Sequence, residues 1–369
     1  MTRKRPGRHR LPAIAVLLAV ALLGGAACGG DAQEALVAGP PDRGAVGLAM
    51  PTKTSERWVA DGENMRKQFE LLGYRPELAY ADNDIAAQVA QIEAMIKNGD
   101  KAVIIAAIDG TALKEVLAKA TAAHIPVFAY DRLIRDSPDI AYYATFDNFK
   151  VGVQQASYIA EALGLARGAR GPFTIELFAG SADDNNATFF FNGAMSVLKP
   201  YLASGALVVR SGETAFTQVT TQRWDGDIAK QRMQRLLAGP LAAVHVDAVL
   251  SPYDGISRGI IDALKAAGRG GRLPVVTGQD AELESVKLIM AGQQSQTVYK
   301  DTRELAKVAV QMTNAVLTGG SPEVNDTSQY DNGVKVVPTF LLQPVSVDRS
   351  NYRRVLVDGG YYTASQIGG

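Results

Sequence analysis

The amino-acid sequence predicts an α/β protein made of two doubly wound lobes, each built on a parallel β-sheet. Short β-branched or apolar runs alternate with amphipathic helical stretches through most of the chain, and the two halves look alike. The chain has 369 residues. This is more than one hydrophobic core usually serves, so two lobes are expected.

The N-terminus reads as an export signal. A head with five basic residues precedes the apolar run 11–23, and small residues lead from there to Cys28. The apolar run is shorter than the ~20 residues that a membrane-spanning helix needs. We therefore predict a signal peptide at 1–27, followed by a tether rich in Gly, Pro and Asp at 28–44.

Cys28 is the only cysteine of the chain, so it cannot form an internal disulfide. It stands where a bacterial lipoprotein signal places the residue that is lipidated, although Gly25 replaces the usual Leu three positions earlier. This predicts an exported, periplasmic or cell-surface protein anchored through lipidated Cys28. The small residues 25–27 would also suit ordinary cleavage, which would leave a free thiol.

The pattern of the body of the chain predicts short strands that alternate with longer helices. Helices are expected at 85–99, 149–164 and 256–268, among others. Strands are expected at 46–50, 77–81, 102–108, 125–130, 141–146, 173–180, 206–210, 246–251, 274–278 and 296–299. In open parallel sheets, ligands bind outside the carboxyl ends of the strands.

Carboxylates recur at those strand ends: Asp109, Asp131, Asp147, Asp184, Asp254 and Asp280. Any one of them could cap a helix N-terminus. Ser or Thr would cap as well, however, and they are rarer at these positions. A run of Asp at so many strand ends therefore indicates more than capping.

Cations and aromatic rings accompany these carboxylates: Arg57, Trp58, Arg132, Trp224 and Lys300. Such a set predicts a cleft in which charged groups bond to hydroxyls while flat rings stack on an apolar face. A pyranose has hydroxyls at its edge and C–H groups on its faces. In "GSADDNNATFFFN" (180–192), the Asp and Asn side chains would reach sugar hydroxyls, and the Phe run would pack behind them or line the cleft lip.

Other functions fit the residues less well. The signal contains five of the 38 basic residues and none of the 38 acidic ones, so the mature body is mildly acidic and unsuited to nucleic acid. The G-x-S-x-G pattern at 255–259 lacks a later His partner. Phosphate-binding loops are absent, and two His residues outside the signal are too few to suggest a metal site, so no cofactor or metal is expected.

A glycoside-acting enzyme stays open as an alternative, because the sequence does not give the separation of paired carboxylates. Each predicted carboxylate nevertheless has a cationic or hydroxyl partner that would keep it ionised. We therefore predict no enzyme and no catalytic residue.

The motifs "MPTKTSERW", "AYDRLI", "YYATFDNFKVG", "DDNNA", "VLSPYDG", "TGQDAEL" and "TVYKDTRELAK" occur in order from about Val46 to Tyr362. Together they resemble bacterial periplasmic sugar-binding proteins of ABC importers, in the xylose-binding and multiple-sugar-binding (ChvE-type) group. The resemblance implies a type I periplasmic binding protein fold with three hinge crossings, near 146–149, 278–281 and 325–334. The N-terminal lobe would comprise 45–147 and 281–325, and the C-terminal lobe 148–280 and 326–369.

The resemblance also implies a set of sugar-binding residues: Lys53, Arg57, Trp58, Asp131, Arg132, Asp184, Asn186, Trp224, Asp280 and Lys300. Lys53 is implied by some relatives only. Tyr253 stands where many relatives have Asn, which leaves the contact at that position open.

The function implied is a monomeric receptor that closes on an aldose of the xylose, glucose, galactose or arabinose type. The closed form would deliver the sugar to an ABC permease in the membrane. The alternative is a sugar sensor whose closed form docks on a membrane signalling receptor.

Overall fold

The computed structural model describes residues 42–368 of the chain. The N-terminal lobe is built on a six-stranded parallel sheet in the order β11-β5-β4-β3-β1-β2. Its strands are β1 (Ala45–Met50), β2 (Arg75–Tyr80), β3 (Val103–Ile105), β4 (Val127–Tyr130), β5 (Tyr142–Phe146) and β11 (Thr339–Leu342).

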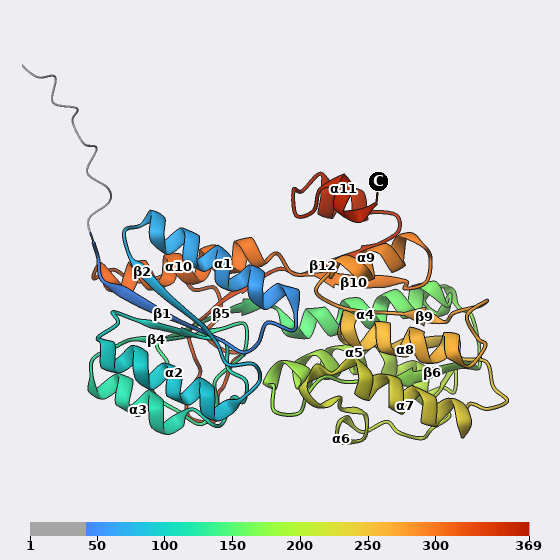
Figure 1. The fold of residues 1–369 in the computed structure, drawn as a ribbon. Coiled ribbons are helices and arrows are strands. Elements are labelled where there is room, and N and C mark those ends of the chain that lie inside the picture. The colour runs from blue at the N-terminus through green and yellow to red at the C-terminus, as the bar shows by residue number, and fades with distance from the viewer. Residues whose placement is uncertain (1–41, 369) are drawn as a thin grey trace, which may run out of the picture. The chain divides into compact units, whose positions relative to one another are not determined.

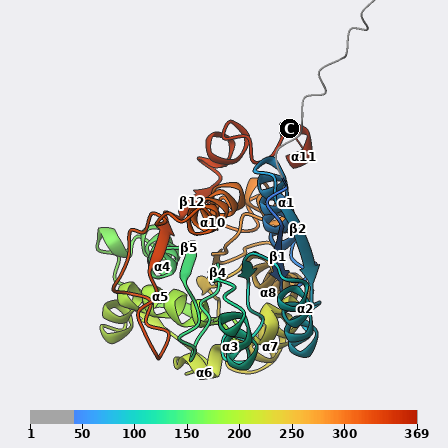
Figure 2. The same cartoon turned by 90° about the vertical axis from the view of Figure 1, so that its left-hand side faces the viewer.

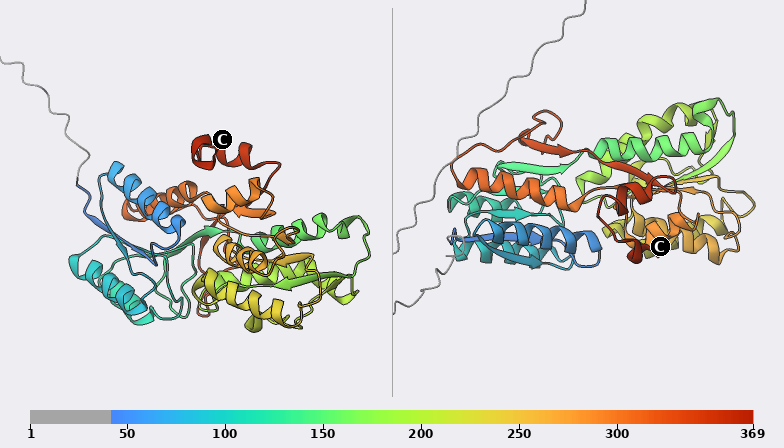
Figure 3. Two further views of the ribbon diagram at one scale, coloured as in Figure 1. Left: turned by 45° about the vertical axis from the view of Figure 1, so that its right-hand side comes forward. Right: turned by 90° about the horizontal axis from the view of Figure 1, so that it is seen from above.

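Helices cover both faces of this sheet (Figures 1 and 2). Along β1, Leu48 packs on one face and Ala49 on the other, because successive side chains of a strand point to opposite sides. Helices α1 (Glu56–Leu71) and α10 (Thr302–Leu317) run side by side over the first face, as the right-hand view of Figure 3 shows. Helices α2 (Ile85–Asn98) and α3 (Lys114–Ala122) cover the second face.

The C-terminal lobe has a second parallel sheet in the order β7-β6-β8-β9. The antiparallel pair β10 and β12 continues this sheet, because Val298 of β10 exchanges backbone hydrogen bonds with Gly278 and Asp280 beyond β9. The strands are β6 (Phe173–Leu177), β7 (Leu207–Val208), β8 (Ala248–Leu250), β9 (Val275–Val276), β10 (Gln296–Tyr299) and β12 (Val345–Asp348).

Helices α4 (Asn148–Ala162) and α5 (Asn185–Ala203) pack on one face of this second sheet. Helices α7 (Gly226–Ala238) and α8 (Asp254–Ala266) pack on the other face. The lobe is completed by α6 (Phe216–Val219), α9 (Leu283–Met290), α11 (Ala364–Ile367) and the short helical turns Leu165–Arg167, Gln222–Trp224 and Arg353–Val357.

The predicted fold class is confirmed: two α/β lobes with parallel sheets form the type I periplasmic binding protein architecture. Every strand predicted from the apolar runs has a counterpart, and the predicted strand 296–299 coincides with β10. Strands β11 and β12 were not predicted. They follow Pro338 and Pro344, and each is only four residues long.

Two of the predicted lobe boundaries are wrong. The first crossing, between β5 and α4, lies where it was predicted, but the second lies between β10 and α10 and the third between β11 and β12. Residues 281–299 therefore remain in the C-terminal lobe, and residues 326–342 remain in the N-terminal lobe, where β11 pairs with β5. Strand pairing decides these boundaries, and it joins segments up to 200 positions apart that no local pattern connects.

The predicted signal peptide, Cys28 and most of the tether lie outside the described residues. Among residues 42–368, no helix is both long enough and apolar enough to span a bilayer.

Glycines set the close approach of α4 and α5. A Cβ at Gly152 would lie 1.9 Å from the carbonyl oxygen of Phe190, and one at Gly193 would lie 2.0 Å from that of Phe149. The two helix backbones touch, and no side chain fits between them.

We expect Gly193→Ala to lower the free energy of unfolding by about 1–3 kcal/mol, the usual cost of overpacking. The matched control is Gly271→Ala, because a Cβ there meets no atom within 4 Å. It should leave the stability unchanged or raise it slightly. Urea denaturation followed by circular dichroism measures both. Equal stability of the two variants would contradict the packing argument.

Candidate ligand-binding site

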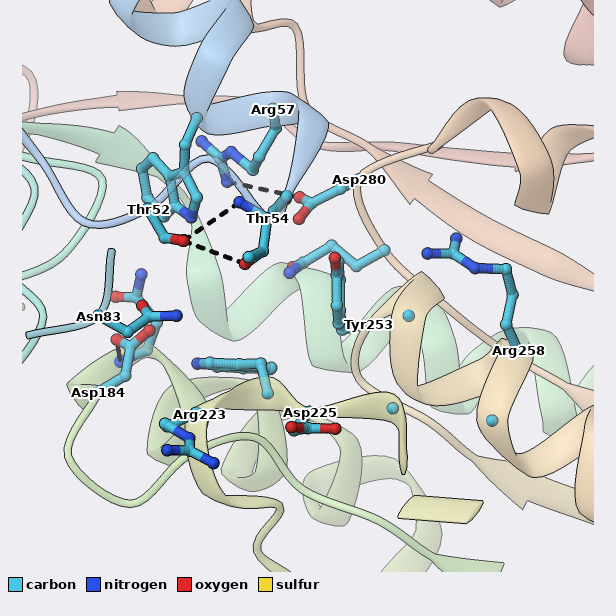
Figure 4. A pocket seen from close by; sticks show the side chains of 18 of the residues that line it. Thr52, Thr54, Arg57, Asn83, Asp184, Arg223, Asp225, Tyr253, Arg258 and Asp280 are labelled. Atoms are coloured by element: carbon cyan, nitrogen blue, oxygen red, sulfur yellow. Dashed lines mark hydrogen bonds and ion pairs between the residues drawn. The ribbon is translucent and has the colours of Figure 1, made fainter. Parts of the chain in front are cut away.

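A cavity of about 610 Å³ lies where the carboxyl ends of strands from both lobes meet. It is lined by all but one of the residues that the sequence predicted: Arg57, Trp58, Asp131, Arg132, Asp184, Asn186, Trp224, Asp280 and Lys300. Figure 4 shows Arg57 and Asp280 on one side of this cavity, with Asp184, Arg223 and Asp225 on the other.

The buried guanidinium of Arg57 joins three carboxylates. Its Nη2 lies 2.9 Å from Asp131 Oδ2, its Nη1 lies 3.4 Å from Asp280 Oδ1, and its Nε lies 3.1 Å from Asp61 Oδ2. Asp61 lies one turn further along α1 and also accepts a hydrogen bond from the Tyr130 hydroxyl. Burial raises the pKa of Asp61 to about 6, although the Arg57 charge opposes this shift.

Lys300 supplies a second cation to the same carboxylates. Its Nζ is 3.1 Å from Asp280 Oδ1 and 3.7 Å from Asp131 Oδ2. Burial by itself would raise the pKa of Asp131, but the charges of Arg57, Lys300 and Arg132 outweigh burial and lower it. Asp131 is therefore an ionised hydrogen-bond acceptor at neutral pH.

Contacts at the cavity floor connect the two lobes. Arg132 Nε of the N-terminal lobe forms an ion pair with Asp184 Oδ2 of the C-terminal lobe at 3.0 Å. Burial raises the pKa of Asp184 despite this partner. Asn186 Nδ2 donates to the backbone oxygen of Asp131 at 2.8 Å, and Asn186 Oδ1 accepts from Asn148 Nδ2 at 2.9 Å.

Asp184 is both a helix cap and part of the cavity wall. Its Oδ1 accepts from the backbone N–H of Asn186 at the start of α5, and its Oδ2 pairs with Arg132 in the cavity wall. The residue therefore caps the helix and faces the cavity at the same time.

Each lobe contributes one of the two tryptophans to the cavity. The guanidinium carbons of Arg57 and Arg132 lie 4.6 and 5.1 Å from the ring centre of Trp58, within cation–π range. Trp224 packs edge-on against Phe190 and Tyr253, with ring centres 6.1 and 6.2 Å apart.

The three consecutive phenylalanines at 189–191 have different surroundings. Phe190 lines the cavity, whereas Phe189 packs near Tyr330 and Phe191 near Phe216, with ring centres 5.1 and 5.6 Å apart. One ring therefore faces the ligand space, and its two neighbours anchor α5 to the lobe core and to the opposite lobe.

Six residues that line the cavity have left-handed backbone conformations although none is glycine: Asp82, Asn83, Asp131, Arg223, Trp224 and Asp280. Asp131, Trp224 and Asp280 have φ values of 57°, 58° and 89°. Each such residue costs of order 1–3 kcal/mol and persists only where its surroundings impose it. Such strain concentrates at functional sites, which supports a binding role for this cavity.

Lys53 is the predicted site residue that does not line the cavity. It is exposed, and its ammonium lies 5.1 Å from the ring centre of Tyr80. Three strand-end carboxylates also lie outside the cavity lining and have other partners: Asp109 accepts from Thr111, Asp147 caps α4, and Asp254 accepts from the backbone of Glu282.

Some residues that line the cavity, and Asp61 behind Arg57, escaped the sequence analysis. Asp61 could have been found, because it lies four positions after Arg57 on one helix, a spacing at which side chains meet. Thr52, Asn83 and Arg223 carry no local signal that distinguishes them from other loop residues. Within residues 42–368, no group of three His, Cys, Asp or Glu side chains is arranged to hold a metal ion.

Comparisons with known proteins agree with this geometry. The family model "Periplasmic binding protein domain" matches residues 46–321. The chain is 59% identical over 329 residues to the multiple sugar-binding periplasmic receptor ChvE of Rhizobium radiobacter, covering 88% of this chain and 93% of that protein. It is 33% identical over 324 residues to the D-xylose-binding periplasmic protein of Escherichia coli (strain K12), covering 87% of this chain and 92% of that protein.

A solved structure is also similar. It is an ABC transporter solute binding protein from Clostridium phytofermentans with bound β-D-glucose, at 48% identity and a TM-score of 0.85. The match covers 88% of this chain and 99% of that one. The family resemblance predicted from the motifs is confirmed.

Gly180 allows the indole of Trp224 to take its place in the cavity wall, because a Cβ there would lie 1.9 Å from the indole Cη2. We expect Gly180→Ala, in a Trp58→Phe background, to displace the half-buried Trp224 ring and shift its fluorescence to longer wavelength. Gly271→Ala in the same background is the control. Unchanged emission from the Gly180 variant would show that the ring does not depend on this glycine.

Proposed function

The chain belongs to the family of periplasmic binding proteins, and we propose that it is an extracytoplasmic receptor that binds one monosaccharide between its lobes. The single observation that carries the proposal is the alternation of carboxylates and cations around the cavity. Asp131 and Asp280 share Arg57 and Lys300, and Asp184 pairs with Arg132.

This alternation suits a polyhydroxylated ligand. Each sugar hydroxyl donates one hydrogen bond and accepts others, so it needs an acceptor and a donor side by side. Arg57 and Lys300 approach Oδ2 of Asp131, whereas among the described residues Oδ1 receives only a long 3.5 Å contact from the Asn186 amide. Oδ1 therefore has acceptor capacity left for a hydroxyl.

The aromatic residues and the cavity size fit the same class of ligand. Trp58 and Trp224 offer flat faces on which the C–H side of a pyranose can stack. A volume of about 610 Å³ lies within the ~300–1,000 Å³ typical of small-molecule sites. The β-D-glucose bound to the similar Clostridium phytofermentans protein makes glucose the first candidate. Xylose, galactose and arabinose follow.

Hinge closure would make sugar binding change the shape of the receptor. Three chain crossings connect the lobes, at 146–148, 299–302 and 342–345, and ligand groups come from both lobes. The closed form would dock on an ABC permease. Docking of the same closed form on a membrane signalling receptor is the alternative, and it requires the same sugar-binding event.

The charges around Asp131 argue against this residue as the general acid of a glycoside hydrolase. A general acid needs a raised pKa to hold its proton at neutral pH, and the pKa of Asp131 is lowered by its cationic partners. Asp131 and Asp280 are both held by Arg57 and Lys300, which suits binding.

We expect the mature body, residues 29–369, to bind at least one of xylose, glucose, galactose and arabinose with 1:1 stoichiometry in isothermal titration. Trp224→Ala and Asp131→Asn should each weaken the affinity by at least ~1–3 kcal/mol, through loss of a stacking face or of a buried hydrogen-bond partner. Circular dichroism shows whether each variant is folded.

Lys53→Ala is the matched control for this titration. Because Lys53 is exposed and lies outside the cavity lining, its removal should leave the dissociation constant unchanged. Wild-type affinity in both cavity variants would contradict the proposed site. Turnover of aryl glycosides, abolished by Asp131→Asn, would replace the receptor with an enzyme.

We also propose that lipidated Cys28 anchors the receptor at the membrane. In cells fed a clickable fatty acid, the wild-type protein should carry label and sediment with membranes. Cys28→Ser should lose the label and become soluble in the periplasm. Label-free wild-type protein in the soluble fraction would favour ordinary signal cleavage instead.

A further inference from the structure

We propose that Tyr253 is a positioning residue: through Glu282 it ties the two lobes together beside the ligand, and through its ring it holds Trp224 in place. This inference rests on the proposed sugar-binding function. Tyr253 lies directly before α8 in the cavity lining. Figure 4 shows its side chain in the cavity below Asp280.

The tyrosine hydroxyl bonds to a carboxylate that does not line the cavity. It donates to Oε1 of Glu282 at 2.6 Å. Burial and the neighbouring Glu282 charge raise the pKa of Tyr253 well above its ordinary value, so the hydroxyl remains a neutral donor. The residue therefore faces a ligand with its ring, while its hydroxyl acts on the protein.

Glu282 collects contacts from both lobes. It is 5% exposed, and its Oε1 also accepts from the Ser55 hydroxyl at 3.2 Å. Its Oε2 pairs with Arg258 at 2.6 Å. Its backbone N–H donates to Asp254 at 2.9 Å, which holds the residue in place at its other end.

Ser55 brings the N-terminal lobe into this group. It stands at the N-cap of α1, where a serine would ordinarily bond to the first turn of its own helix, yet it makes no such side-chain bond. Its hydroxyl instead reaches Glu282 in the C-terminal lobe. The loop that ends at Ser55 leads directly to Arg57 and Trp58, so this bond fixes the segment that presents both residues.

The ring of Tyr253 connects the same group to Trp224. The two rings meet edge to face, with centres 6.2 Å apart and planes at 87°. Gly255 makes room for the tyrosine, because a Cβ there would lie 2.5 Å from its ring. Moving the tyrosine ring would remove one wall against which the indole rests.

These contacts form a continuous chain from Ser55 through Glu282 and Tyr253 to Trp224. It is separate from the Arg57–Asp280 ion pair, which also crosses between the lobes. Loss of the Tyr253 hydroxyl should therefore weaken the closed form and loosen the indole without removing any group that touches the sugar.

The test compares Tyr253→Phe, Ser55→Ala and the double variant by titration with each aldose that the wild-type protein binds. Each single change should weaken binding about threefold to tenfold, the loss of one net hydrogen bond. The factor should be the same for every sugar. Because both hydroxyls act through Glu282, the double variant should lose less than the product of the two single losses.

Tyr142→Phe is the matched control. Tyr142 is half-buried in β5, stacks near Phe128 and lies outside the cavity lining. It should bind with wild-type affinity. Wild-type affinity of Tyr253→Phe, or a loss confined to one sugar, would overturn the positioning role, since the latter would indicate direct contact between hydroxyl and ligand.

A second readout separates failure of this inference from failure of the proposed function. In a Trp58→Phe background, Tyr253→Phe should shift Trp224 emission whether or not a sugar binds. If the wild-type protein binds no aldose but this shift occurs, the sugar function fails and the positioning role survives. If sugars bind and the emission is unchanged, the positioning role is overturned.

Discussion

The buried ion cluster around Arg57 is the constraint on which the rest of the site depends. The Arg57 guanidinium is only 5% exposed, so it must find its ion-pair partners within the protein. These partners are carboxylates from α1, from the end of β4 and from the segment after β9. Removing charges from water is costly unless partners and hydrogen bonds compensate. The cluster meets this requirement with Lys300 and the Tyr130 hydroxyl, so a set of hydrogen-bond acceptors persists inside a folded protein.

The fold delivers these groups by placing strand ends together. Asp131 follows β4 directly, and Lys300 follows β10 at the crossing into α10, so one cation sits on the segment that joins the lobes. The left-handed backbone at Asp131 and Asp280 turns both side chains toward Arg57. The energy stored in those turns is offset by the packing of two complete lobes, which explains why such strain is tolerated here.

Residues from both lobes form the cavity wall and contact one another there. Arg132 and Asp184, Asn186 and Asp131, and Ser55 and Glu282 each join residues from different lobes. A rigid-body rotation of one lobe would therefore change several polar contacts together, and a ligand that bridges the lobes adds to them. Interfaces of this kind tend to be bistable, which is what a receptor that signals by closure requires.

The sequence alone determined the fold class, nearly all the strands and nine of the residues that line the cavity. Alternating and continuous apolar runs indicate which segments of the chain are buried strands. Asp residues at successive strand ends indicate that these side chains lie along one edge of a parallel sheet. The side chains at the strand ends suggested a sugar, and the family resemblance added the expected importer. Asp131, Asp184 and Asp280 were thus identified before any coordinates, together with the cations beside them.

Only the tertiary structure decided the lobe boundaries, the separation of Lys53 from the cavity and the contacts of Asp61 and Tyr253. β11 belongs to the first sheet because it pairs with β5, and Glu282 matters because it meets Ser55 across 227 positions of chain. Such contacts depend on which distant segments come together in space. A sequence pattern predicts the surroundings of a residue within its own helix or strand. It does not predict which distant residue the rest of the fold places beside it.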